Sequence, residues 1–220
     1  MALSKLTYNS LNVTPVANKG IGFDSGADDL STDFAGGSIR FIKKLTADGS
    51  GTSLSFVDGT SDVVLDDTYK EYLFIFKDIH PASDGVDFEF NMSIDSGSNY
   101  NVTKTTTLVD TVHREDGTNG AVGYSGSRDI AQGTGSQDLM GGIGNDNDQS
   151  GSGILHLFNP SSTTFVKHFI SKTQYYNSTD YSISMYIAGY ANTTSAVDAI
   201  QFSISSGNMD AGTISLYGIN

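Results

Sequence analysis

Histidine is the side chain best suited to acid–base chemistry or metal binding at neutral pH, and this sequence has four. His156 and His168 lie on either side of a predicted turn, so they could face each other across a hairpin. A zinc site needs at least a third protein ligand, and the sequence places none near this pair. We therefore interpret the histidines as partly buried strand residues: His80, His113, His156 and His168.

A short acidic segment resembles the start of a calcium-binding loop. Residues 146–151 reproduce the D-x-D-x-S-G order of its first six positions. The twelfth position should supply a bidentate Glu but is Leu157, and the loop opens into a predicted strand without flanking helices. The sequence therefore predicts no metal centre and no cofactor. Asp146 and Asp148 stay as candidate ligands of a loosely held hard cation.

Other catalytic or cofactor-binding motifs are incomplete or absent. Residues 123–127 miss the last glycine of a nucleophile elbow, and residues 133–135 lack the third glycine of a dinucleotide fingerprint. The chain has no Gly-Lys-Ser/Thr phosphate loop and no cysteine. With 25 acidic residues, carboxylate pairs arise by chance and do not argue for a glycosidase dyad. We predict that the protein is not an enzyme and has no catalytic residues.

The charge balance bears on possible partners. The chain has 12 Lys and Arg against 25 Asp and Glu, a net charge of −13, which repels nucleic acid and anionic membranes. No stretch is apolar over the length that a membrane-spanning helix requires, and the N-terminus has no signal-peptide core. We expect no nucleic-acid partner, no membrane partner and synthesis in the cytosol without a cleaved signal.

Alternation of polar and apolar residues predicts strands from residue 38 onward. Residues 86–94 alternate strictly, which is typical of a half-exposed strand. Residues 73–76 are consecutively apolar, so the strand over 69–79 is expected to be central and buried on both faces. No segment shows helical periodicity. Further strands are predicted over 38–45, 52–57, 63–65, 105–113, 154–158, 164–173, 181–187, 199–204 and 212–219.

This pattern predicts an all-β fold, an antiparallel β-sandwich or jelly roll, as a single domain over residues 38–220. Residues 114–153 interrupt it, because they are rich in Gly, Asp, Asn and Ser and have no sustained period. A connection of this length is unusual inside a compact domain. The segment either contains short strands or is one long Gly-rich loop that meets a neighbouring chain or a ligand.

The first residues, 1–37, differ in character from the rest. They carry spaced apolar residues without a period, although one short edge strand is compatible with the pattern. We predict an extended N-terminal arm that attaches the domain, because such anchors need a partner surface to bury them. The candidate assembly interface is Leu3, Leu6, Tyr8, Leu11 and Val13.

Tyrosines gather in the last third of the chain: Tyr175, Tyr176, Tyr181, Tyr186 and Tyr190. Tyrosine in an exposed loop is a favoured contact residue for proteins and sugars. On a strand it more often belongs to the core or its rim, and the predicted strands favour that interpretation. In the alternative, the chain is a carbohydrate- or host-receptor-binding module that uses the 114–153 loop and Tyr175 and Tyr176.

Three stretches resemble virion structural proteins of tailed phages that infect marine bacteria, including cyanobacteria. They are residues 1–14 (MALSKLTYNSLNVT), 56–65 (FVDGTSDVVL) and 72–81 (YLFIFKDIHP). Most of the chain has a similar general character to these proteins. Residues 114–153 are the region that differs from them.

The resemblance implies a particle component, either tail-associated (fibre, tip or adaptor) or decorating the capsid, and it transfers no catalytic residue. It also implies a virion location after synthesis in the host cytoplasm, other virion proteins as partners, and a homo-oligomer, for which a trimer is one option. A host-surface glycan is a candidate ligand.

Overall fold

The computed structural model describes residues 22–23, 30–31 and 38–220. The chain divides into two compact units, residues 1–40 and 41–220. In the first unit, β1 (Gly22–Phe23) pairs antiparallel with β2 (Leu30–Ser31). The predicted arm anchors lie outside the described residues: Leu3, Leu6, Tyr8, Leu11 and Val13.

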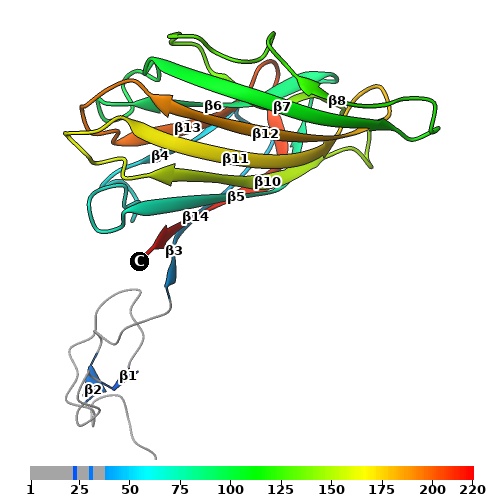
Figure 1. The fold of residues 1–220 in the computed structure, drawn as a ribbon. Helices are drawn as coiled ribbons and strands as arrows, with labels where there is room; N and C mark the ends of the chain where they lie inside the picture. Colours follow the sequence, from blue (N-terminus) through cyan, green and yellow to red (C-terminus); the bar gives the residue numbers. More distant parts are fainter. Residues whose placement is uncertain (1–21, 24–29, 32–37) are drawn as a thin grey trace, which may run out of the picture. The chain divides into compact units, whose positions relative to one another are not determined.

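The other described strands form two antiparallel sheets, one of eight strands and one of four (Figure 1). No described residue is helical, so the predicted all-β sandwich is confirmed. In spatial order the larger sheet contains β3 (Ile39–Thr46), β14 (Met209–Ile219), β5 (Glu71–Pro81), β10 (Gly151–Phe158), β11 (Lys167–Tyr176), β12 (Tyr181–Ala191), β7 (Lys104–Arg114) and β8 (Gly120–Tyr124). The smaller contains β4 (Ser53–Val57), β13 (Ala199–Ile204), β6 (Val86–Ser93) and β9 (Gln137–Ile143).

Eight of these strands have the connectivity of a jelly roll. The chain alternates between the sheets through β3, β4, β5 and β6, and again through β9 and β10 and through β13 and β14. The resulting orders, β3-β14-β5-β10 and β4-β13-β6-β9, are those of two interlocked Greek keys. The pairs β7–β8 and β11–β12 are insertions that extend the larger sheet beyond β10, so this sheet is wider than its partner.

Phe202 on β13 is the centre of the core between the sheets. Its ring centroid lies 5.1 Å from that of Phe76 and 5.2 Å from that of Phe74. The rings of Phe56 and Phe88 also lie near that of Phe202, and these five side chains are buried. Aromatic pairs at these separations are attractive beyond the area they bury. This cluster therefore holds the two sheets together.

Strand β5 is central, as predicted, but it is not equally buried on its two faces. Tyr72, Phe74 and Phe76 point into the core and are buried, whereas Leu73 and Ile75 on the opposite face are only half-buried. The expectation of burial on both faces is wrong because no described segment forms a third layer over the larger sheet. This sheet presents apolar side chains to solvent in the described part of the chain.

The segment 114–153 contains short strands, which was one of the two alternatives open from the sequence. It includes β8 and β9 and the start of β10. Residues 125–136 between β8 and β9 are fastened to the sandwich edge: the buried Lys104 donates from Nζ to the Gly135 carbonyl at 2.5 Å and to Asn91 Oδ1 at 2.8 Å. The backbone of Lys104 also exchanges hydrogen bonds with Gly133. The segment is thus part of the domain edge and not one long free loop.

Residues 63–65 do not form the predicted strand. Val63 and Leu65 are buried, but the backbone makes local turn hydrogen bonds, and the Leu65 N–H donates to Asp58 Oδ1 at 2.8 Å. Apolar residues in a short loop can close one end of a core without joining a sheet, which is why the apolar pattern alone was misleading here.

Candidate functional site

The surface that stands out is the outer face of the larger sheet, by which we mean the side turned away from the four-stranded sheet. Side chains on β11 alternate strictly between buried and exposed positions, and those on β12 and β7 follow the same alternation over their central residues. Several apolar side chains on the exposed side are large: Ile170 is 50 % exposed, Tyr186 49 %, Val122 72 % and Tyr124 59 %. An apolar surface of this kind often marks a binding site.

Strand register brings these residues into rows across the sheet. Lys172 on β11 lies opposite Tyr186 on β12, Tyr186 lies opposite Val109 on β7, and Val109 lies opposite Tyr124 on β8. The Lys172 ammonium is 5.2 Å from the centre of the Tyr186 ring, within range of a cation–π contact. One continuous row therefore crosses four strands that come from two separate hairpins, β7–β8 and β11–β12.

A hollow lies beside this row, where small residues interrupt β12. Ala188, Gly189, Ile170 and Tyr190 are among the residues that line it. Its volume is about 440 Å³, within the range of small-molecule pockets. Gly189 is required for the backbone packing, because a Cβ there would lie 2.6 Å from the Thr105 carbonyl oxygen. We call this hollow the outer-face groove; His168, Thr105 and Thr107 also line it.

One end of the outer-face groove is polar. Gln132 Nε2 donates to Thr105 Oγ1 at 2.7 Å and lies 3.4 Å from the Tyr190 hydroxyl. Asn192 Nδ2 donates to Gln132 Oε1 at 2.7 Å, so two amides and two hydroxyls form one network. The ring of His168 lies 6.1 Å from the Tyr190 ring. Gln132 has a φ of +52°, a left-handed conformation that six other non-glycine residues of the described chain also adopt.

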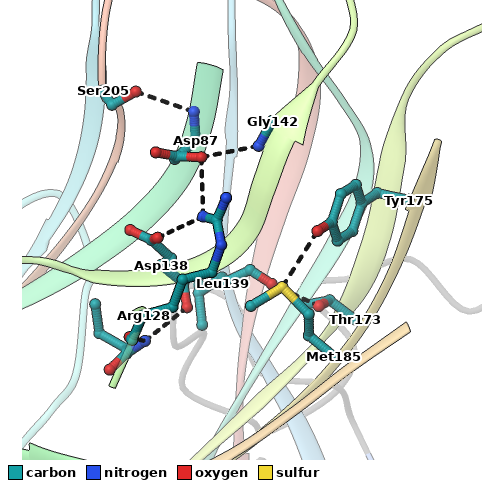
Figure 2. Close-up of polar contacts among 10 residues, drawn as sticks. Asp87, Arg128, Asp138, Leu139, Gly142, Thr173, Tyr175, Met185 and Ser205 are labelled. Carbon is teal, nitrogen blue, oxygen red and sulfur yellow. Dashed lines mark hydrogen bonds and ion pairs between the residues drawn. The ribbon is translucent and has the colours of Figure 1, made fainter. Parts of the chain in front are cut away.

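A second polar cluster lies at the edge of the smaller sheet and ties residues 125–136 to it (Figure 2). Arg128 Nη1 donates to Asp87 Oδ1 at 3.1 Å and to Asp138 Oδ2 at 2.6 Å. Asp87 Oδ1 also accepts the Gly142 N–H at 2.8 Å. Burial, together with the neighbouring Asp87, raises the pKa of Asp138, and Arg128 partly offsets this. Since Arg128 binds both carboxylates, we interpret this cluster as a structural tie.

The four histidines are not brought together. His156 lies opposite Ile170 and pairs with Glu71, while His168 contacts Tyr190. His80 Nδ1 lies 2.7 Å from Asp210 Oδ1. The hypothesis that His156 and His168 face each other in register is wrong, although both lie on the outer face. Each is placed by a different neighbour.

The acidic segment 146–151 forms a turn that closes on itself. The Gln149 N–H donates to the Asp146 carbonyl at 2.9 Å, and the Asp146 N–H donates to Gln149 Oε1 at 3.2 Å. Within residues 38–220 no three His, Asp or Glu side chains are grouped so that they could hold a metal ion. Asp146 and Asp148 therefore have no third His, Asp or Glu side chain beside them, among the described residues, that could complete a metal site.

The tyrosines divide between core and surface. Tyr175 is 2 % exposed and its hydroxyl lies 3.4 Å from Met185 Sδ inside the sandwich (Figure 2). Burial raises the pKa of Tyr175 to about 12. Tyr175 thus cannot contact a glycan, and that part of the alternative is wrong. Tyr190 lines the outer-face groove, and Tyr186 lines a second hollow that shares Ile170 and Ala188 with the groove.

The pattern of polar and apolar residues in the sequence does not identify the outer face as a site. One signal was available: the run at residues 73–76 is apolar at both odd and even positions, and its second set of side chains lies on this face. The apolar residues 73–76 do not by themselves show whether a further layer covers the side chains on this face.

Comparison of the chain with protein-family models, with curated proteins and with solved structures found no match. The described residues include no helix that is long and apolar enough to cross a membrane.

Proposed function

We propose that this chain is a non-enzymatic structural component of a phage virion, either tail-associated (fibre, tip or adaptor) or decorating the capsid. The observation that carries the proposal is the outer face of the larger sheet. Its exposed aliphatic and aromatic side chains cross β11, β12, β7 and β8 on a chain whose net charge is −13. Protein subunits that assemble bury surfaces of this kind.

Two further features support the proposal. The jelly roll is a fold that many capsid proteins use, although the fold by itself does not determine a function. The three stretches that resemble virion proteins of tailed phages point in the same direction. In this proposal the N-terminal arm attaches the domain to other virion proteins, and the outer face is a contact surface within the particle.

The test is to ask whether purified particles contain the chain. Antibodies raised against the recombinant protein are applied to particles of the phage that encodes it, and labelled sites are located by electron microscopy. Regularly placed label on the tail or the capsid supports the proposal. Particles that carry no label, and whose mass spectra lack peptides of this chain, contradict it. Particles treated with antibody to an unrelated protein are the control.

The outer-face groove favours a second candidate function, the binding of a host-surface glycan. Sugars are bound by an aromatic ring that stacks on their apolar face and by side chains that hydrogen-bond their hydroxyls. Tyr190 and the amides of Gln132 and Asn192 offer both at one end of the groove.

A glycan array tests this second function. Saturable binding that is lost in Tyr190→Ala and in Gln132→Ala, and retained in Tyr176→Ala, supports it. Tyr176 is the matched control because it is a partly exposed tyrosine at the far end of β11 from the groove. Binding that survives Tyr190→Ala, or the absence of binding to any glycan, contradicts it.

A further inference from the structure

The free edge of strand β8 is unusual among the strands of this protein. All five of its residues are exposed, which holds for no other strand whose side chains are described. β8 pairs only with β7 and ends the eight-stranded sheet, so no described segment pairs with its other edge (Figure 1). An uncovered edge strand is a template for pairing with another strand.

β8 also lacks the features that normally block such pairing. Its sequence, Gly120-Ala121-Val122-Gly123-Tyr124, has no charge and no proline, and its register with β7 is continuous without a bulge. The other ends of the sheets differ. β3 carries Arg40, Lys43 and Lys44, the register of β9 against β6 contains bulges, and β4 is buried or half-buried along its length.

The hydrogen-bond pattern shows which groups the edge offers. The Arg114 N–H donates to the Asn119 carbonyl and the Ser125 N–H donates to the Leu108 carbonyl, at the two ends of the β7–β8 ladder. Since bonded pairs alternate in an antiparallel ladder, Ala121 and Gly123 point their backbone groups toward β7. The N–H and C=O groups of Gly120, Val122 and Tyr124 therefore point away from the sheet.

We propose that β8 pairs with β8 of a second copy of this chain, antiparallel and about a two-fold axis at Val122. In this register Val122 lies opposite Val122 of the other copy, and Gly120 lies opposite Tyr124 in both directions. Every outward N–H meets a C=O, so the edge is complementary to itself, as a two-fold interface requires. An aromatic ring beside a glycine on the neighbouring strand is a favourable cross-strand pair.

Two observations favour a second copy over an unrelated strand. Two copies of this chain each carry a net charge of −13, so they repel each other least where the contact surface itself has no charge, because more distant charges are screened by salt; β8 has no charged residue. In addition, edge pairing about this axis keeps both outer faces on the same side of the joined sheet. The exposed side chains of Val122 and Tyr124 from each copy then join the two apolar outer faces into one.

This inference deepens the proposed function, because it names one surface through which copies would assemble. The first test is sedimentation of the full chain and of Val122→Pro over a range of concentrations. The Val122 N–H points outward, so proline there removes no bond to β7 but removes the central bonds of the pairing. We expect the dissociation constant of the dimer to rise at least about tenfold. Phe165→Ser is the control, since it removes an exposed aromatic ring away from β8 and should leave the dimer intact.

A second measurement keeps the test valid if the proline variant unfolds. The chain has no cysteine, so Val122→Cys introduces a single thiol. A short bismaleimide should join two such copies, whereas Thr60→Cys, an exposed turn position, should give no covalent dimer. A chain that is monomeric at every concentration, a dimer unaffected by Val122→Pro, or no cross-linking through residue 122 would overturn the proposal.

The outcomes for the edge and for the virion role are separate. If β8 variants change nothing but antibody labels the particle, the edge pairing is wrong and the virion role stands. If residue 122 cross-links but particles lack the chain, the pairing stands and the virion role fails.

Discussion

Tyr186 on β12 lies directly opposite Val109 on β7, and both side chains point to solvent, with 49 % and 41 % of their surface exposed. Opposed apolar side chains on an antiparallel pair normally stabilise a sheet by packing on each other. Here they also leave apolar surface uncovered on the described part of the chain. This relationship makes the outer face the first region to test.

Replacing Tyr186 and Ile170 together by Ser should reduce self-association and the binding of a hydrophobic dye, with little effect on folding. Substitutions at exposed positions usually change the free energy of unfolding by no more than about 0.5 kcal/mol each. Light scattering and dye fluorescence measure the first two, and urea unfolding measures the third. Gln174→Ser is the control, because Gln174 is exposed on the same strand and face but is polar. Unchanged self-association would remove the outer face as an assembly surface.

Phe202→Ala should lower the free energy of unfolding by about 3–5 kcal/mol, the range for truncating a buried phenylalanine. Phe202 is fully buried and its ring contacts rings from both sheets, so the cavity cannot close by a local shift. Urea denaturation measures the loss. Phe165→Ala, at a ring 68 % exposed, should cost far less. Equal losses in the two variants would mean that Phe202 is not central to the core.

The buried Lys104 should make stability depend on alkaline pH. Burial lowers the pKa of Lys104 to about 8, and the charge of Glu89 opposes this only in part. Between about pH 8 and pH 10.5 the folded chain has released a proton that the unfolded chain still holds, so the unfolding free energy rises with pH. Relative to Lys104→Met, the wild type should gain roughly 1–3 kcal/mol across this window. Urea unfolding at both ends of the window gives the difference, and parallel pH profiles would contradict it.

Arg128→Leu should loosen residues 125–136. It leaves Asp87 and Asp138 close together without their shared cation, and since the site is about one-third exposed, we expect a loss of roughly 1–2 kcal/mol. Hydrogen exchange should speed up in this segment more than in the core strands. Arg114→Leu, which breaks an exposed pair with Asp116, should have no such local effect. Unchanged exchange at residues 125–136 would show that Arg128 is not what holds them.

His80 should contribute stability that is present in acid and lost toward alkaline pH. Burial opposes its charge, but hydrogen bonds with Asp210 and with the Asp146 carbonyl outweigh this and raise the pKa of His80. A raised folded pKa gives full stabilisation below the ordinary pKa of histidine, and the contribution disappears as the pH passes the folded pKa. The melting temperature of Asp210→Asn should therefore fall below that of the wild type by more at about pH 5.5 than at about pH 8. A titration of the His80 ring by NMR checks the direction, and an unshifted pKa in the wild type would contradict the prediction.

The sequence by itself determined the fold class of residues 38–220. Alternation of polar and apolar residues over 86–94 and 181–187 predicts extended strands, because a period of two is that of a strand, and both segments form strands. The half-exposed character predicted for 86–94 holds only in part, since Asn91 and Ser93 on the polar side are buried and Ile94 is exposed. The failed spacing of the calcium, dinucleotide and nucleophile motifs was also visible without coordinates. Local patterns of this kind depend only on neighbours along the chain.

Only the tertiary structure decided which strands are neighbours and which sides remain uncovered. Nothing in the sequence around Val109 predicts that it lies opposite Tyr186, or that residues 114–153 supply two strands fastened by Lys104. Likewise the apolar run at residues 73–76 predicted burial on both faces, but burial of the second face requires another layer, which the described chain does not provide. Periodicity reports which way a side chain points, whereas strand order and coverage arise from packing between distant segments.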